Sequence, residues 1–204
     1  MSNKKTEFNT LDLGLNSSRA VEHAKNLAER GIEVCPVDQF GQPMETPSRA
    51  LKDILRWSET HGLANFAAAC GRKYGLAVID VDEERLARVE HENGPFPLTW
   101  RVRREPGKVH LWFKIPTIGK EIEPPMQGPL RWTLFPKKFA PIPGGFKKGA
   151  TYAWETEAGA APSLCPLAML PADWLWALRM SARPAQPKRG PEEFDASSHR
   201  KRFD

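Results

Sequence analysis

Two aspartates separated by one residue are the side chains of this sequence best suited to chemistry. Asp80 and Asp82 end the apolar run 76–79, which a glycine precedes and a charged segment follows. Such a short run of bulky, partly β-branched residues predicts a buried strand. Because side chains alternate along a strand, the two carboxylates point to one face about 7 Å apart. They would bind a hard cation such as Mg²⁺ or Mn²⁺, unless the strand runs out into solvent and both acids are hydrated.

A histidine lies on a predicted hairpin further along the chain. Residues 99–103 alternate in polarity, and the turn-forming stretch 105–108 leads from them into residues 109–115, so the two segments are expected to pair as antiparallel strands. His110 stands between two apolar residues, and alternation turns it away from their apolar side. There it would contact a phosphate group, or else be a partly buried histidine satisfied by hydrogen bonds.

Basic and aromatic residues near this hairpin are candidates for contact with nucleic acid or nucleotide. The basic residues of the hairpin are Arg101, Arg103, Arg104, Lys108 and Lys114, and a later glycine-rich loop adds Lys147 and Lys148. These residues would neutralise the phosphate oxygens of a template or a triphosphate, or form a solvated surface. Trp112 and Trp154 would stack on bases or belong to the core.

Composition narrows the class of protein. The chain has 204 residues, 40% hydrophobic and 27% charged, which predicts a globular domain with a sizeable core. A formal net charge of +5 suits an anionic partner, although part of it lies in a basic tail. Cys35, Cys70 and Cys165 are widely spaced, which predicts reduced thiols rather than a zinc site. The polar start and the lack of a long apolar run predict a cytoplasmic protein without membrane contact.

Periodicity and turn residues indicate the elements that must position the candidate side chains. Helices are expected over 17–30, 49–60, 83–93 and 171–180, and strands over 32–37, 65–70, 76–82, 99–103, 109–115, 130–134, 139–142 and 149–154. These elements predict an α+β domain over residues 17–180, with a mixed, largely antiparallel central sheet flanked by helices. A flexible arm at 1–16 would precede it, and a disordered basic tail at 181–204 would follow.

Three local features of this prediction can be checked directly. Residues 71–75 are expected to form the tight turn of a hairpin between the strands at 65–70 and 76–82. Ser48 or Thr46 is expected to cap the second helix. The inner face of that helix would consist of Leu51, Ile54, Leu55 and Trp57.

The order of the segments resembles the bifunctional primase/polymerase N-terminal domain. This domain belongs to the archaeo-eukaryotic primase superfamily of phage, plasmid and bacterial replication proteins. The resemblance runs from about residue 19 to 178 and implies the primase-polymerase architecture, one half of which is similar to an RNA-recognition fold. It rests on Asp80-x-Asp82, His110, the loop 140–145 and Gly149-x-x-Tyr152-x-Trp154, together with the segment 31–36 and the helix ending at Trp57.

The resemblance implies a role for each matching residue. Asp80 and Asp82 would bind two divalent ions that activate a primer 3′-hydroxyl and hold the incoming triphosphate. His110 would contact nucleotide phosphate, as the histidine of the family's Ser-x-His strand does. The serine of that strand is replaced here by Lys108, which can hold phosphate as a point charge.

One family element is missing. The family has a lone acidic residue on the strand before the loop 140–145, but residues 129–135 contain no Asp or Glu, and Leu130 takes the place. The nearest acids are Glu123 and Glu155. Two carboxylates suffice for one metal carried in with a triphosphate, whereas a second ion is harder to hold.

The resemblance therefore implies metal-dependent nucleotidyl transfer on a single-stranded DNA template, with (deoxy)nucleoside triphosphates as substrates, in phage, plasmid or mobile-element replication. One alternative is a weakened or inactive relative that binds DNA or nucleotide in a replication complex. Another is an unrelated phosphotransfer fold that shares only Asp-x-Asp. The chain has no Gly-x-x-x-x-Gly-Lys-Ser/Thr phosphate loop, so the protein would either act alone or work with a helicase supplied separately.

Overall fold

The computed structural model describes residues 10–62, 65–104, 107–117, 133–134, 139–147, 150–172 and 174. In chain order the elements are α1 (Thr10–Glu29), β1 (Val34–Val37), α2 (Leu51–Thr60), β2 (Asn65–Ala69), the 3-10 helix η1 (Arg72–Tyr74), β3 (Leu76–Asp82), α3 (Glu83–Asn93), β4 (Arg101–Arg104), β5 (Lys108–Lys114), β6 (Thr133–Leu134), β7 (Phe139–Pro141), β8 (Phe146–Lys147) and β9 (Ala150–Trp154).

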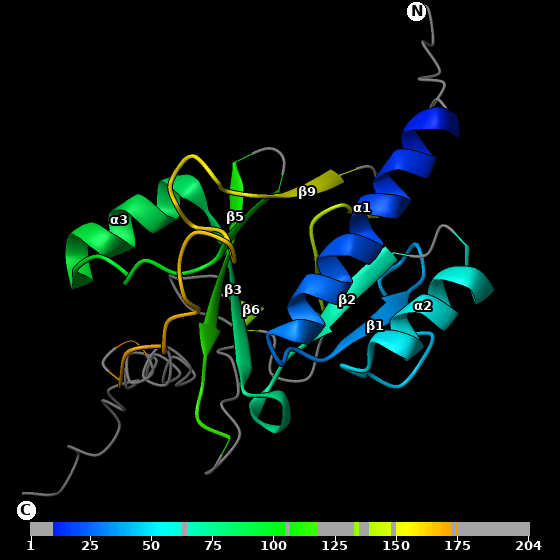
Figure 1. Ribbon diagram of the computed structural model, residues 1–204. Coiled ribbons are helices and arrows are strands. Elements are labelled where there is room, and N and C mark those ends of the chain that lie inside the picture. The colour runs from blue at the N-terminus through cyan, green and yellow to red at the C-terminus, as the bar shows by residue number, and fades with distance from the viewer. Residues whose placement is uncertain are drawn as a thin grey trace, which may run out of the picture.

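The strands form two antiparallel sheets. The larger sheet has the order β6-β3-β5-β4-β9-β8, and the smaller one has the order β1-β2-β7. The smaller sheet lies beside α1 and α2, and α3 lies at the other side of the molecule (Figure 1). This architecture confirms the predicted α+β class and the predicted hairpin of β4 and β5. Pro36 lies on β1, an edge strand, where its missing N–H costs no ladder bond.

The large sheet separates two hydrophobic cores. Leu76 and Val78 of β3 belong to the core formed with α1, α2 and the smaller sheet. Ala77, Ile79 and Val81 belong to the other core, which includes Leu86 of α3 and several aromatic residues. Because β3 is covered on both faces, its sequence is a continuous apolar run until the acids begin.

The N-terminal helix packs tightly against the smaller sheet and the turn that follows it. Ala20, Ala24 and Leu27 of α1 are fully buried, as their helical spacing predicted. The turn after β7 contains Gly144, whose φ of +80° favours glycine. A Cβ at this position would lie 2.6 Å from the backbone nitrogen of Ala20, so only glycine allows this contact.

The hairpin predicted for residues 65–82 is wrong. β2 pairs with β1 and β7, while β3 pairs with β5 and β6, so the two strands belong to different sheets. The segment between them forms η1, and a single bridge joins Gly71 to Leu76. The segment 71–75, which was predicted to be a hairpin turn, is therefore the connection by which the chain passes from the smaller sheet to the larger one.

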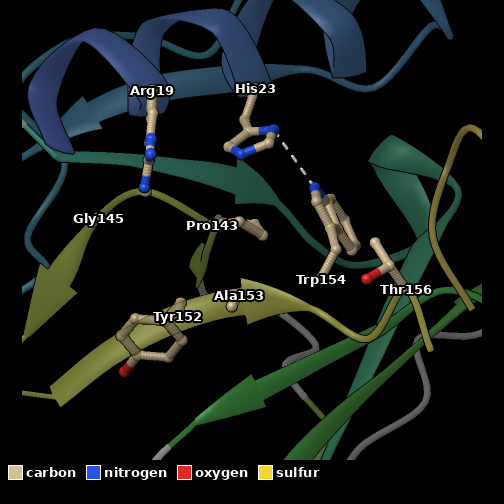
Figure 2. A pocket seen from close by; sticks show the side chains of 9 residues that line it. Arg19, His23, Pro143, Gly145, Tyr152, Ala153, Trp154 and Thr156 are labelled. Carbon is tan, nitrogen blue, oxygen red and sulfur yellow. Dashed lines mark hydrogen bonds between the residues drawn. The ribbon is translucent and has the colours of Figure 1, made fainter. Parts of the chain in front are cut away.

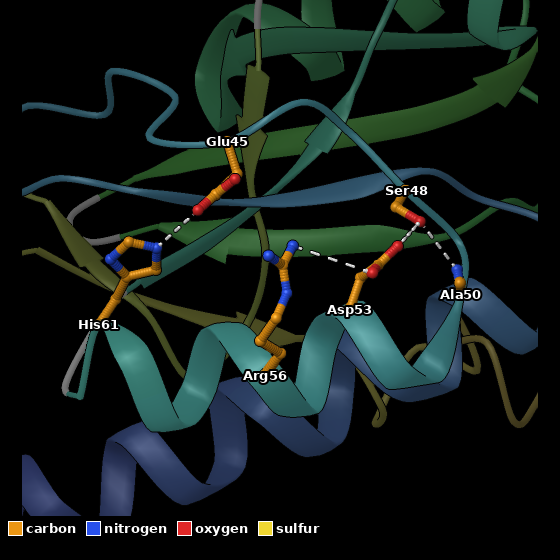
Figure 3. Close-up of polar contacts among 6 residues, drawn as sticks. All are labelled: Glu45, Ser48, Ala50, Asp53, Arg56 and His61. Carbon is orange, nitrogen blue, oxygen red and sulfur yellow. Dashed lines mark hydrogen bonds and ion pairs between the residues drawn. The ribbon is translucent and has the colours of Figure 1, made fainter.

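The predictions for α2 are partly wrong. Ala50 is the N-cap residue, with no side-chain cap. Ser48 lies two residues earlier, where its hydroxyl accepts the Ala50 N–H and donates to Asp53 (Figure 3). Ile54 and Trp57 are buried as predicted, whereas Leu51 and Leu55 are about two-fifths exposed. At the other end of the helix, His61 pairs with Glu45 at 3.1 Å (Figure 3).

The N-terminal end of the domain differs in extent from the prediction, and the C-terminal end is described only as far as Trp174. α1 begins at Thr10, within the segment predicted to be a flexible arm. Trp174 is buried, as predicted, and stacks on Phe96 with ring centroids 4.0 Å apart. The rest of the predicted final helix, with Leu175 and Leu178, lies outside the described residues. Among the residues that the structure describes, no helix has the length and apolarity needed to span a bilayer.

Candidate functional site

Cross-strand register brings the two aspartates and the histidine to one face of the large sheet. Asp80 lies directly opposite His110, and Asp82 lies opposite Lys108, on the paired strands β3 and β5. Residues directly opposite each other in an antiparallel pair point to the same side. We call this side of the large sheet the acid face. The expected meeting of carboxylates and imidazole therefore occurs, through strand pairing rather than through a loop.

Asp80 is mostly buried against the imidazole. His110 is 2% exposed and the Asp80 side chain 19%, and Nε2 of His110 lies 3.7 Å from Oδ1 of Asp80. This separation exceeds hydrogen-bond range. Within the described part of the chain, Oδ1 is buried and accepts no hydrogen bond. A buried carboxylate oxygen in this state is costly unless a cation or donor from outside the chain satisfies it.

Asp82 is in a different electrostatic environment. Its carboxylate is 44% exposed and lies 3.5 Å from Nζ of Lys108 and 3.7 Å from Nε of Arg85. Two cations thus compensate this acid in the absence of any ligand. Because Lys108 lies directly opposite Asp82 in the strand register, its ammonium group faces that carboxylate on the acid face.

The acid face continues across two further strands. Arg104 of β4 lies opposite Lys108, and Tyr152 of β9 lies opposite Arg104. Arg104 is half-buried, and its buried Nε has no hydrogen-bond partner within the described residues. The Tyr152 ring lies 5.6 Å from the His110 ring. Burial raises the pKa of Tyr152, an effect that nearby Arg104 opposes and Asp80 reinforces.

The other two arginines of β4 lie on the opposite face. Arg101 is 3.8 Å from Glu90, and Arg103 is 3.6 Å from Glu83 and 2.8 Å from Glu155. The hydrogen bond to Glu155 raises the pKa of Arg103. Glu155, one of the two acids nearest to the missing family residue, therefore lies away from the acid face and is paired with an arginine.

The remaining predicted basic residues lie elsewhere. Lys114 is exposed at the far end of β5, four residues or about 13 Å along the strand from His110. Lys147 belongs to β8 at the edge of the large sheet, and its side chain lies outside the described residues. Lys148, Glu123 and Leu130 also lie outside them.

A divalent cation fits part of the acid face. The donor set consists of the Asp80 and Asp82 carboxylates, which are oxygen ligands of the kind that Mg²⁺ and Mn²⁺ take. The buried Oδ1 of Asp80, which accepts no hydrogen bond from described residues, is the observation that supports such a ligand. The described residues contain no group of three or more His, Cys, Asp or Glu side chains that could hold a metal. The two aspartates would therefore share the ion with a bound triphosphate and water.

A cavity adjoins the acid face between α1 and β9. It has a volume of about 450 Å³ and is lined by Arg19, His23, Pro143, Gly144, Gly145, Tyr152, Ala153, Trp154 and Thr156. Arg19 and His23 project from α1 towards the sheet (Figure 2). Sequence reasoning missed both, because polar residues on a helix are normally solvated. Tyr152 was noted only as part of a family motif.

The two tryptophans considered as base-stacking residues differ in exposure. Trp112 is fully buried, as expected for a core residue. Trp154 is partly exposed, lines the cavity, and donates from Nε1 to Nδ1 of His23 at 3.4 Å (Figure 2). Burial lowers the pKa of His23, which leaves its imidazole neutral and able to accept this bond at pH 7.

Comparison with known families gives one match. The family model described as bifunctional DNA primase/polymerase, N-terminal, matches residues 24–173. The matched range includes both sheets, the acid face and most of the cavity lining. Among proteins of curated function, none was found to match this chain.

Proposed function

Because the chain belongs to the bifunctional DNA primase/polymerase N-terminal family, we propose that it adds nucleotides to a 3′-hydroxyl on a single-stranded DNA template. The donor is a nucleoside or deoxynucleoside triphosphate. A bond forms between the 3′-oxygen and the α-phosphorus, and the bond from that phosphorus to the leaving pyrophosphate breaks. The observation that carries this proposal is the pairing of Asp80 with His110, which brings a buried carboxylate oxygen next to an imidazole.

Each residue of the acid face has a proposed role. Asp80 and Asp82 hold a divalent ion, and the chemistry that Mg²⁺ or Mn²⁺ supplies there is neutralisation of triphosphate charge and activation of the 3′-hydroxyl. His110 and Lys108 contact phosphate oxygens. Lys108 is already 3.5 Å from Asp82, so it links the acid to the phosphate chain once a triphosphate is bound.

Among the basic residues, Arg104 is the strongest candidate for DNA or phosphate contact. It lies on the acid face and, unlike Arg101 and Arg103, has no carboxylate partner among the described residues. Arg101 and Arg103 are paired with glutamates on the opposite face and would have to exchange those partners to bind DNA. Lys147, which belongs to β8 at the sheet edge, and the next residue in sequence, Lys148, are proposed to follow the DNA backbone, and Lys114 is a more distant phosphate contact.

A second candidate function is binding without catalysis. It is favoured by the two-carboxylate donor set, because the described residues provide no third metal ligand and Asp82 is compensated by two cations. In this case the protein would hold DNA or nucleotide within a replication complex of a phage, plasmid or other mobile element, beside a separately supplied helicase.

Primer extension in Mg²⁺ and in Mn²⁺ distinguishes the two functions. The first predicts extension of a labelled primer that Asp80→Ala reduces by more than about 100-fold, since even indirect partners of a metal are worth about 10- to 100-fold. Glu84→Ala is the matched control, because Glu84 is an exposed acid just beyond the strand. Absence of extension with either metal, together with DNA binding unaffected by Asp80→Ala, would establish the binding function instead.

A further inference from the structure

We propose that the cavity between α1 and β9 binds one nucleotide of a single-stranded DNA strand, with its base against Trp154 and its phosphate at Arg19. This inference rests on the proposed function, since it assigns a strand site next to the acid face. Arg19 and His23 lie outside both the family motifs and the predicted basic hairpin, whereas Trp154 and the turn 143–145 belong to segments on which the family resemblance rests.

The lining of the cavity suits a nucleotide in size and chemistry. Its volume of about 450 Å³ falls within the roughly 300–1,000 Å³ of typical ligand sites. Pro143, Ala153 and the Trp154 indole supply apolar surface, and the residues that line it include no carboxylate. Arg19 is exposed on α1, and in Figure 2 its guanidinium group extends towards the turn at Gly145. Apolar surface beside one guanidinium group matches a base joined to a phosphate.

Trp154 is held in place before any ligand arrives. Its indole makes edge contacts with Trp100 and Trp112, with ring centroids 6.0 and 5.6 Å apart. Its Nε1 donates to His23, and the two rings are T-shaped at 6.3 Å. A side chain already fixed in this way loses little conformational entropy when a base stacks on it. Base stacking on aromatic side chains is tolerant of sequence, as a moving template requires.

The position of the cavity favours a strand over the incoming nucleotide. Three strand spacings separate β3 from β9, which amounts to about 14 Å at the usual distance between strands. Asp80 and Trp154 stand at the two ends of one cross-strand row. Tyr152 of β9 comes close to His110, but a base stacked on Trp154 would lie farther from an α-phosphate at Asp80 than the one sugar of an incoming nucleotide spans. Arg104 and Tyr152 lie between the two places on the acid face. A strand that passes Arg104 would reach the cavity next.

The first test measures the salt dependence of oligonucleotide binding to the full chain. The logarithm of the binding constant falls linearly with the logarithm of salt concentration, and each phosphate contact on single-stranded DNA contributes about −0.7 to that slope. A variant that loses one contact therefore has a shallower slope. We expect this change in Arg19→Ala, together with weaker binding. Arg30→Ala is the matched control, because it removes the same charge from the residue directly after α1, outside the cavity. Equal slopes in the two variants would overturn the phosphate contact.

The second test compares oligothymidylate with an abasic strand of equal length. Stacking of one base on an aromatic side chain is worth about 1–3 kcal/mol, which corresponds to about a 5- to 150-fold preference for the strand that has bases. We expect Trp154→Phe to retain most of this preference and Trp154→Leu to lose it. His23→Ala, a change outside the core, should reduce it because the indole loses its fixed orientation. An unchanged preference in His23→Ala and Trp154→Leu would overturn the base contact.

A third measurement separates this inference from the proposed function. Asp80→Ala should abolish primer extension yet keep the base preference, whereas Arg19→Ala should weaken strand binding. If the wild-type protein extends no primer but its strand binding depends on Arg19 and Trp154, the catalytic proposal fails and the strand site stands. If Arg19→Ala instead weakens binding of a lone deoxynucleoside triphosphate and not of the strand, the strand site is wrong.

Discussion

The two faces of the large sheet carry similar residues in different electrostatic states. On the opposite face, Arg101 and Arg103 are paired with glutamates from α3 and from the end of β9. On the acid face, Arg104 has no carboxylate partner within the described residues, and Asp80 has a buried oxygen that accepts no hydrogen bond there. The same strand, β4, contributes arginines to both faces.

The difference shows why residue type alone does not identify a binding residue. An arginine whose charge is compensated inside the fold must give up its partner before it binds an external anion. An arginine that has no carboxylate partner in the fold can bind an external anion without first breaking an ion pair. Strand alternation separates the two kinds at neighbouring positions, so the candidate surface is one face of the strand rather than the whole basic hairpin.

The largest expected difference between the faces is in DNA binding. Arg104→Ala should weaken binding of a labelled single-stranded oligonucleotide by about 10- to 100-fold, because charge-assisted hydrogen bonds are worth about 1.5–3 kcal/mol. Arg103→Ala is the matched control and should change binding by less than about twofold, since rim charges outside the contact contribute little. Fluorescence anisotropy at fixed salt measures both. Equal losses would show that the opposite face also binds DNA.

The second expected difference is that neutralising an acid stabilises the protein on the acid face and destabilises it on the opposite face. Asp80→Asn should raise the free energy of unfolding by about 1 kcal/mol in a metal-free buffer, because it neutralises a mostly buried carboxylate whose Oδ1 accepts no hydrogen bond from the described residues. Glu155→Gln, on the opposite face, should lower this free energy slightly, because it removes the partner of Arg103. Urea denaturation measures both. A destabilised Asp80→Asn variant would mean that Asp80 is already satisfied within the fold.

The smallest expected effect concerns His23, beside the cavity. Burial lowers the pKa of His23 from its ordinary value of 6.5. Two charged neighbours have smaller effects on this pKa: Glu22 raises it, and Arg19 lowers it. As pH falls, the unfolded chain therefore takes up the His23 proton before the folded protein does. The contribution of His23 to stability is complete above pH 6.5 and is lost as pH falls towards its pKa in the folded protein. His23→Gln should reduce the difference between urea midpoints at pH 8 and pH 5.5. An unchanged difference would show that His23 titrates normally in the folded protein.

Local patterns were sufficient to predict much of this molecule. The apolar run of β3, the alternation before and within β4 and the turn that leads into β5 are visible in the sequence, and all three strands form as expected. For each strand the signal lies within about ten consecutive residues, where side-chain alternation alone determines which face a residue occupies. The order of the motifs along the chain also led to the family that the comparison confirms.

Long-range pairing accounts for what the sequence did not reveal. The segment before β3 has the composition of a hairpin turn, but β7, about 70 residues later, takes the place beside β2. The glutamates that pair with Arg101 and Arg103 come from outside β4, so the sequence of the hairpin does not predict these ion pairs. His23 and Trp154 meet across 131 residues. Only the three-dimensional fold brings such residues into contact.

The contact between Gly144 and α1 sets the size of the opening beside β9. Because the turn touches the helix backbone at Ala20, the separation is determined by main-chain atoms and not by adaptable side chains. The distance between Arg19 and the β9 surface is therefore set by the backbone. In the proposed strand site, a bound nucleotide would meet main-chain walls whose spacing does not adapt to it.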